Sequence, residues 1–409
     1  MRPYRFAANP RQRWPNCWLA TFLLGIVAAS RCGIAQTPDA IDDQVRLHQL
    51  QWIGTHNSYH IAPHPRLEKW IALAGKSILE GIQYTHRPLK EQLSQLQIRQ
   101  LELDVYADPK GGLFSKPVGA AMASAAGDSK DLDPNADGAM DLPGFKILHA
   151  PGFDYATRVA TLREAFQQIR DWSDQSPGHL PVLVMIELKE SSPASAGVSL
   201  VPFDRPLLQQ LDALIHASFP RQQLLLPADL KQEGLETIRD SVLQQGWPKV
   251  SQARGKLIFA LDNEGSWVDR YLDAQEGNPQ KATLFVSVES THPMAAWMKR
   301  NDPVGQFEEI QSLVRRNFMV RTRADADTRQ ARSGDTSRRD SAWASGAHWI
   351  STDFPEPDPR WPDYWVAWPD RQVARWNPLH PPAHASPVRW EPRIEISGAK
   401  SEVTEKLGR

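Results

Sequence analysis

The sequence contains little cysteine, no excess of charge of either sign and almost no long hydrophobic runs. Two cysteines among 409 residues exclude a disulfide scaffold and a thiolate zinc cluster. The 47 basic and 48 acidic side chains nearly cancel, which argues against a nucleic-acid binder with its usual basic excess. The hydrophobic content of 41% still allows a sizeable core, so an intrinsically disordered chain is excluded as well.

The first 35 residues have the composition of a secretory signal peptide. Four arginines precede an uncharged, mostly apolar run over residues 17–30, and small residues follow it. This run is shorter than the about 20 residues that span a bilayer, although an uncleaved membrane anchor is the alternative. Cleavage after Ala35 would remove both cysteines and five arginines, leaving a net charge of −6. We therefore expect a secreted or periplasmic protein without thiol chemistry.

Short apolar runs alternate with helical patterns through most of the remaining chain. We expect helices over residues 161–174, where Thr161 is a plausible N-cap, and over 205–217, 304–316 and 328–345. Such alternation is typical of a parallel sheet, and eight units predict a closed α/β (β/α)₈ TIM barrel, with a doubly wound open sheet as the alternative. The eight candidate strands are residues 50–54, 100–106, 145–148, 181–188, 256–261, 284–288, 318–321 and 349–352.

The predicted organisation is a single catalytic barrel domain over residues 43–375, after the signal peptide at 1–35. Residues 107–144 form a long loop after the second strand. Residues 376–409 form an extension that contains proline and tryptophan, and its polar end is expected to be disordered.

Polar side chains gather where the predicted strands end, which is where a (β/α)₈ barrel builds its active site. Glu102 and Asp104 share one face of their strand, so they would repel each other unless a cation or a shared proton compensates. Glu187 adds a carboxylate inside an apolar run, where ionised groups are costly. With the carbonyl oxygen of Asn57 this all-oxygen set suits Ca²⁺ or Mg²⁺ better than zinc, and secretion favours Ca²⁺.

Two histidines accompany these carboxylates, His56 after the first strand and His149 after the third. Histidines that flank such a cation are typical of a general base and a general acid acting on a phosphodiester. Taken singly, a histidine at a strand end is more often structural than catalytic.

The motifs GTHNSY, RQLELDVY, FKILHAP and MIELKE, in this order, resemble the catalytic X-region of phosphoinositide-specific phospholipase C. The secreted, calcium-dependent bacterial branch of that family is the most similar. MVRTRADADT and WISTDFPEPD resemble the closing strands of the same barrel. The resemblance extends from Gln51 to Pro359, most of the chain after the signal peptide.

This resemblance implies a role for each matching residue. His56 would deprotonate the inositol 2-hydroxyl, and His149 would protonate the departing diacylglycerol oxygen, leaving a cyclic inositol phosphate. The implied partners are a phospholipid or inositol phosphodiester substrate and, transiently, a membrane surface, without nucleic acid or an obligate protein partner. The implied calcium ligands are Asn57, Glu102, Asp104 and Glu187.

Four further residues are candidates for contact with the substrate. Lys189 shares the face of Glu187 and could hold the phosphate or form a structural ion pair. Arg321, Arg323 and Asp353 lie near the ends of the last two strands, where they could bind inositol hydroxyls or phosphates, or only solvate the rim.

Other functions remain open at this stage. A glycerophosphodiester phosphodiesterase is a barrel relative, but it usually has His-Arg after the first strand where this chain has His56-Asn57. An enzyme cleaving choline-type phospholipids would use the same two histidines. A non-catalytic barrel that binds lipid or sugar phosphates should have lost some of the six residues that are all present here.

Two further features have bland and functional interpretations. Residues 133–141 match the front half of an EF-hand loop, but its twelfth position is Gly144 rather than glutamate, which favours a plain acidic turn. Tryptophan favours a membrane interface, but the net negative charge favours rings that cover the barrel. These rings are Trp361, Trp365, Trp368, Trp376 and Trp390.

Overall fold

The structure is a computed structural model that describes residues 41–124, 133, 135–192, 196–276, 278, 281–381 and 388–391. All of them belong to one compact unit. The predicted signal peptide and the polar residues 392–409 lie outside the described residues. None of the described helices has the length and apolar character needed to cross a bilayer.

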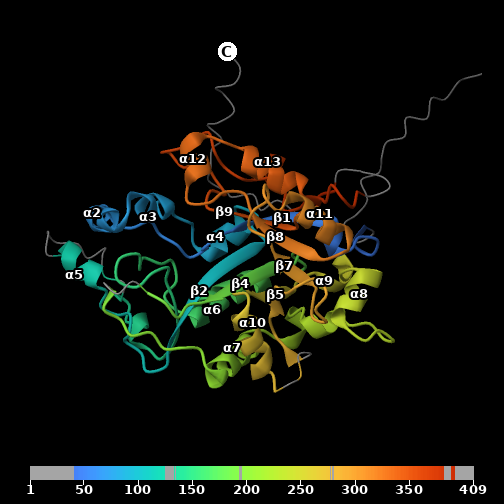
Figure 1. Ribbon diagram of the computed structural model, residues 1–409, viewed down its shortest axis with the longest axis horizontal. Coiled ribbons are helices and arrows are strands. Elements are labelled where there is room, and N and C mark those ends of the chain that lie inside the picture. Colours follow the sequence, from blue (N-terminus) through green and yellow to red (C-terminus); the bar gives the residue numbers. More distant parts are fainter. Residues whose placement is uncertain are drawn as a thin grey trace, which may run out of the picture. The chain divides into compact units, whose positions relative to one another are not determined.

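Eight parallel strands form a barrel that is nearly closed (Figure 1). Their order is β6-β5-β4-β2-β1-β9-β8-β7, and a parallel bridge between Ser287 and Trp297 connects the two ends. This closure confirms the predicted TIM barrel over the open sheet. The strands are β1 (Leu50–Thr55), β2 (Gln100–Asp108), β4 (Val182–Leu188), β5 (Leu257–Leu261), β6 (Phe285–Val286), β7 (Trp297–Lys299), β8 (Met319–Arg323) and β9 (Trp349–Thr352).

The predicted third strand is not one of these eight. Residues 145–148 overlap β3 (Gly144–Ile147), which runs antiparallel to the end of β2, pairing Val105 with Ile147 and Asp108 with Gly144. The barrel strand that the sequence did not reveal is β7, whose three residues are too few to show a pattern. The predicted number of eight strands was therefore right, but one of its members was wrong.

Helices surround the barrel, and α4, α6, α7 and α10 follow one another along its outside (Figure 1). The cap of α6 is as predicted, because the Thr161 hydroxyl accepts a hydrogen bond from the Glu164 backbone N–H at 3.2 Å. The predicted helix over 328–345 is two helices, since Gly334 ends the first with a φ of 68°.

The helices are α2 (Pro65–Ala74), α3 (Lys76–Gly81), α4 (Leu89–Ser94), α5 (Val118–Ser124), α6 (Leu162–Gln175), α7 (Arg205–Ser218), α8 (Ile238–Gln245), α9 (Val250–Ala253), α10 (Ser266–Ala274), α11 (Phe307–Arg315), α12 (Arg329–Ser333) and α13 (Ser337–Ala344). Short 3₁₀ helices are η1 (Leu47–Gln49), η3 (Ala139–Asp141), η5 (Arg221–Gln223), η6 (Pro227–Leu230) and η8 (Pro369–Arg371).

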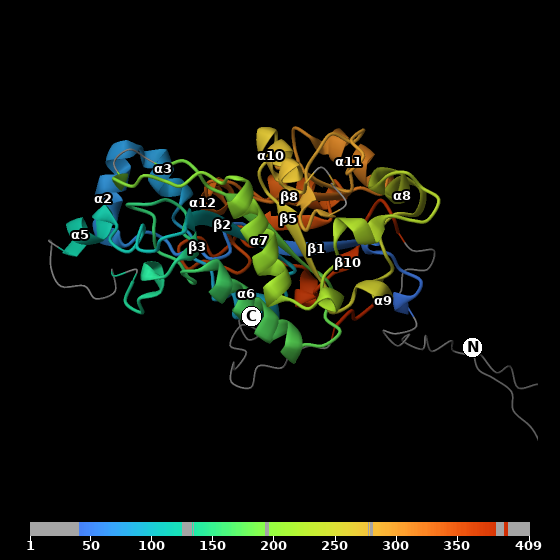
Figure 2. The same cartoon turned by 90° about the horizontal axis from the view of Figure 1, so that it is seen from below.

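The described C-terminal residues cover the end of the barrel where its strands begin. Strand β10 (Arg375–Trp376) pairs antiparallel with the start of β1, as Figure 2 shows. Glu391 pairs with Arg99 and accepts a hydrogen bond of 2.6 Å from the Leu180 N–H, just before β2 and β4. Trp368 and Trp390 are buried in the core. These two rings therefore cover the barrel, as the bland interpretation predicted.

Gly54 is required where β1 meets β2. The side chain of Gln100 crosses it, and a Cβ at Gly54 would lie 2.1 Å from the Gln100 Oε1 atom. We expect Gly54→Ala to lower the free energy of unfolding by about 1–3 kcal/mol in urea denaturation, because Gln100 is buried and cannot move aside. The matched control is Gly81→Ala, whose Cβ would meet its nearest atom at 3.6 Å, so equal losses would contradict this reading.

His48 makes the stability of the barrel depend on pH. Burial, together with the nearby His380 and Arg46, lowers its pKa to about 3, and its Nδ1 atom accepts the Trp247 N–H at 3.1 Å. The folded state therefore holds a neutral ring, so stability falls as the pH drops from about 6.5 towards 3, by about 1.4 kcal/mol per unit for one histidine. His48→Gln should flatten the plot of unfolding free energy against pH between 4 and 6.5. Two parallel plots would contradict this assignment.

Candidate active site

The side chains singled out in the sequence gather where the parallel strands end. Their positions follow from the strand register, since Asp104 on β2 lies directly beside Glu187 on β4. Asn57 adopts a left-handed backbone conformation, with a φ of 43°, in the turn after β1. His56 and Asn57 follow β1, Glu102 and Asp104 lie on β2, Glu187 on β4, Arg321 and Arg323 on β8, and Lys189 and Asp353 directly after β4 and β9.

His56 is held between a carboxylate and a guanidinium group. Its Nδ1 atom lies 2.7 Å from Asp353 Oδ1, and its Nε2 atom lies 3.2 Å from Arg323 Nη1. Because arginine only donates, Nε2 must accept, so the proton of the neutral ring sits on Nδ1 and points at Asp353. Burial, followed by the charges of Arg323 and Arg321, lowers the pKa of His56 well below its usual value. The ring is therefore neutral and offers a lone pair on Nε2.

Glu102, Asp104 and Glu187 form the predicted carboxylate cluster. Each offers an oxygen, and these oxygens all lie within 4.8 Å of one another. Glu102 and Asp104 are buried, whereas the Glu187 side chain is 29% exposed. Burial raises the pKa of Glu102 to about 8 although Arg321 acts in the opposite direction, and burial with the charge of Glu187 raises that of Asp104. Three such groups are stable as anions only beside positive charge.

The donor atoms of this cluster fit a hard cation. The Asp104 Oδ1 and Asn57 Oδ1 atoms are buried without a hydrogen-bond partner among the described residues. Buried acceptors without partners are costly, and an all-oxygen set of this kind is what Ca²⁺ binds. Glu102, Asp104, Glu187 and Asn57 are therefore the residues that could hold the ion.

Two basic side chains already neutralise part of this charge. Lys189 Nζ lies 3.2 Å from Asp104 Oδ2 and 3.2 Å from Glu187 Oε1, which is the ion pair that the sequence left open. Arg321 forms an ion pair with Glu102 and donates to Asn301 Oδ1 at 2.5 Å. Arg321 is buried, so the alternative that it only solvates the rim is wrong.

His149 reaches the site through β3 rather than along a barrel strand. Because β3 runs back along β2, His149 comes down to the level where the parallel strands end. Its Nδ1 atom lies 2.6 Å from Asp154 Oδ2, while its side chain is 28% exposed. The other ring nitrogen, Nε2, is thereby available to a bound molecule. The structure thus gives both predicted histidines a carboxylate partner on Nδ1.

Asp154 and His60 are residues of this site that the sequence analysis did not identify. Asp154 forms a bridge back to Ala150 in the turn after His149, and its carboxylate also contacts His60. The available signal was spacing, because Asp154 follows His149 by five residues and His60 follows His56 by four. Spacing of this kind does not show which pairs meet across two loops.

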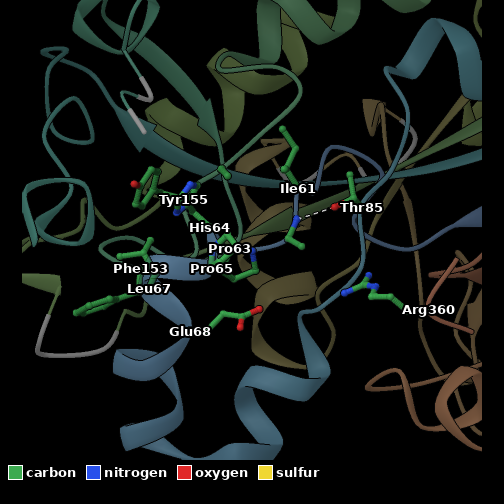
Figure 3. Close-up of a pocket in the computed structure, with 12 residues that line it drawn as sticks. Ile61, Pro63, His64, Pro65, Leu67, Glu68, Thr85, Phe153, Tyr155 and Arg360 are labelled. Carbon is green, nitrogen blue, oxygen red and sulfur yellow. Dashed lines mark hydrogen bonds between the residues drawn. The ribbon is translucent and has the colours of Figure 1, made fainter. Parts of the chain in front are cut away.

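A pocket of about 410 Å³ lies next to His60, Asp154 and His149, which together form the histidine network (Figure 3). Ile61, Thr85, Phe153 and Tyr155 line it, and each of them is the chain neighbour of a residue in or beside the histidine network. The Ala62 N–H donates to Thr85 Oγ1 at 2.9 Å and joins two of its walls. The pocket and the histidine network therefore share the same three chain segments.

The EF-hand-like loop satisfies its own polar groups. Asn135 donates to Asp141 at 2.8 Å and accepts from the Met140 N–H at 2.8 Å, and the Asp133 carboxylate accepts the Asn135 N–H. These side chains bond to the loop itself.

Comparison with known proteins identifies one matching protein family and two curated relatives. The family model described as phosphoinositide phospholipase C, Ca²⁺-dependent, matches residues 45–378. Two curated Mycobacterium tuberculosis proteins, both described as uncharacterized, are 26% identical over 216 residues, covering 49% of this chain. The chain spans 36% of the length of these relatives.

Two of the solved structures that this chain matches are bacterial phospholipases C. A calcium-dependent phosphoinositol-specific phospholipase C from a Pseudomonas species has 15% identity and a TM-score of 0.49, covering 82% of this chain and 96% of its own. A Ca²⁺-dependent phosphatidylinositol-specific phospholipase C from Streptomyces antibioticus has 17% identity and a TM-score of 0.43, covering 76% and 95%. The family match extends over most of the chain, and this protein therefore belongs to the Ca²⁺-dependent phosphoinositide phospholipase C family.

Proposed function

We propose that the protein is an exported, Ca²⁺-dependent phospholipase C that cleaves phosphatidylinositol to diacylglycerol and a cyclic inositol phosphate. The observation that carries this proposal is the pairing of two histidines with carboxylates through Nδ1, beside one carboxylate cluster. This arrangement leaves the Nε2 atoms of His56 and His149 for two proton transfers in one reaction.

His56 is the general base of the proposed reaction. Its neutral ring already carries a lone pair on Nε2, and a substrate hydroxyl would replace the Arg323 N–H that now points at this atom. The inositol 2-hydroxyl loses its proton to Nε2 as its oxygen bonds to phosphorus. Asp353 stabilises the imidazolium that forms, because it accepts from Nδ1 at 2.7 Å.

His149 is the general acid. As the bond between phosphorus and the diacylglycerol oxygen breaks, Nε2 gives its proton to that oxygen. Asp154 keeps the ring oriented through Nδ1. The products are diacylglycerol and a cyclic phosphate, and the later ring opening by water would use the same two groups in reverse.

Calcium would be held by Glu102, Asp104, Glu187 and Asn57. When bound there, it would neutralise charge on the phosphoryl oxygens and make the 2-hydroxyl a stronger acid. Lys189 and Arg323 are the cations of the site whose side chains remain partly exposed, at 21% and 15%. They are the residues that we propose contact the phosphate and the inositol ring, with Asp353 and Arg321 behind them.

A lipid substrate also requires contact with a membrane surface. Trp70 and Leu73 on α2 and Ile78 on α3 are exposed large apolar side chains. Helix α2 follows β1 through the turn that carries His56, so these side chains lie on the site's side of the barrel. Exposed apolar groups in such a place support transient binding to lipid, and the composition of residues 1–35 supports export.

The product of the reaction distinguishes the proposed function from its alternatives. Phosphorus NMR of phosphatidylinositol treated with the purified protein should show a cyclic inositol phosphate in Ca²⁺ and none in chelator. His56→Asn should lower kcat/KM by about 10²- to 10⁴-fold, because proton abstraction is lost. The control His216→Asn alters a histidine on α7 outside the site and should leave turnover unchanged.

Other outcomes of this assay would overturn the proposal. Release of glycerol phosphate from glycerophosphoinositol without a cyclic species would indicate a glycerophosphodiester phosphodiesterase. Absence of turnover on both compounds would remove the proposed substrate.

The proposed calcium ligands can be tested by measuring Ca²⁺ binding directly. Asp104→Asn should raise the Ca²⁺ concentration for half-maximal binding by at least about tenfold in isothermal titration calorimetry, since a charged ligand is lost. Asp137→Asn is the control, because Asp137 lies in the EF-hand-like loop and accepts the Ala139 N–H. Loss of binding in Asp137→Asn alone would place the calcium in that loop instead.

A further inference from the structure

His60 is a buried histidine that the reaction described above does not use. It lies in the turn after β1, and none of its surface is exposed. Its Nε2 atom lies 3.0 and 3.1 Å from the two carboxylate oxygens of Asp154, and its ring adjoins that of His149, with centroids 5.6 Å apart. Its Nδ1 atom lies 3.0 Å from the backbone carbonyl oxygen of Tyr84. The Asp154 carboxylate is therefore shared between two histidines.

The hydrogen-bond partners of the His60 ring determine which of its two nitrogens carry a proton. A carboxylate and a carbonyl only accept hydrogen bonds, and a neutral imidazole has one N–H and one lone pair. A lone pair on either nitrogen would face an oxygen at about 3 Å, which is repulsive. Both nitrogens can donate when the ring carries two protons and Asp154 is ionised. Consistently, although burial raises it, the pKa of Asp154 is lowered overall by His60 and by the hydrogen bond from His149.

We propose that His60 is a positioning residue for the proposed reaction. It keeps the Asp154 carboxylate ionised and oriented towards His149, and the positive charge of the His60 ring offsets the negative charge of Asp154. This inference rests on the proposed function, in which His149 is the proton donor. An aspartate alone stabilises a histidine cation and makes it a weaker acid. A second cation that shares the same carboxylate and adjoins the His149 ring cancels part of this effect. His149 thereby keeps its orientation and still releases its proton.

The surroundings make this charge effect large. His60 is buried against the ring of Tyr84, with centroids 4.4 Å apart, so water screens its charge little. Titratable groups face His149 from several elements. Asp154 lies on its own loop, His60 after β1, and Tyr106 on β2 donates from its hydroxyl to the His149 carbonyl oxygen. His56 interacts electrostatically with His149 across the site.

The residues adjacent in sequence to His60 and Asp154 support the histidine network on the side of the pocket. Ile61, Thr85 and Tyr155 line the pocket of Figure 3, whereas the side chains of their neighbours His60 and Asp154 contact each other in the network. The His60 ring is thus fixed by segments that are themselves tied together by the bond from Ala62 to Thr85.

The test follows the ring of His149 by NMR in protein labelled at histidine. His60→Gln removes the charge and should raise the titration midpoint of His149 by about one pH unit. Asp154→Asn should lower it. His86→Gln is the matched control, a buried histidine of the same region whose ring bonds to the His56 carbonyl oxygen, and it should leave the midpoint unchanged. A midpoint that His60→Gln does not move would overturn the proposal.

Turnover gives a second readout. The basic limb of the plot of kcat/KM against pH should move up by about one unit in His60→Gln and down in Asp154→Asn, whereas a purely structural role would lower the rate without moving it. The NMR titration needs no substrate. The two variants could shift the His149 midpoint in opposite directions while the protein has no turnover on phosphatidylinositol. This result would reject the proposed function but keep the inference that His60 offsets the charge of Asp154.

A third measurement needs no variant. In the unmodified protein, the ¹⁵N shifts of the His60 ring should be those of two protonated nitrogens. A single protonated nitrogen would overturn the proposal even if His60→Gln did not fold.

Discussion

Burying carboxylates where the parallel strands end obliges the fold to place a cation beside each of them. Ionised groups removed from water are stable only when paired, and removing one partner leaves an uncompensated charge. In this barrel the partner comes from a different segment in most cases, so the strands must close in one register for the charges to meet. The pairs are Glu102 with Arg321, Asp104 with Lys189, Asp353 with Arg323, and Asp154 with His60.

Much of the barrel and of the site could be predicted from the sequence. The parallel strands β4 and β5 have nearly continuous apolar runs, which Glu187 interrupts in β4, whereas β2 carries Glu102 and Asp104 at alternate positions. Local signals also fixed the cap of α6. What these signals share is that a few neighbouring residues carry them.

The remainder depended on contacts between distant segments. Strand β7 has three residues and is defined by its neighbours, and β3 has the composition of a barrel strand but pairs in the opposite direction. The partnership of Asp154 with His60 joins two loops that no local pattern connects. The sequence left open whether Arg321 contacts the substrate or only solvates the rim, because its ion pair with Glu102 joins two strands that are distant in the chain.

The antiparallel pairing of β3 with β2, rather than the length of the segment before β3, determines where His149 lies. The strand is fixed to β2 by the pairs from Val105–Ile147 to Asp108–Gly144, and this register alone sets where the chain re-enters the barrel mouth. Because Asp108 and Gly144 are paired, the chain departs from β2 and returns in β3 at one place, and lengthening the connection between them costs only a slowly growing loop entropy. An insertion or deletion in this segment can therefore leave His149 in place if it spares the residues that pack beside the His149 loop, such as Gly119, whose N–H donates to the Gly152 carbonyl oxygen at 2.8 Å.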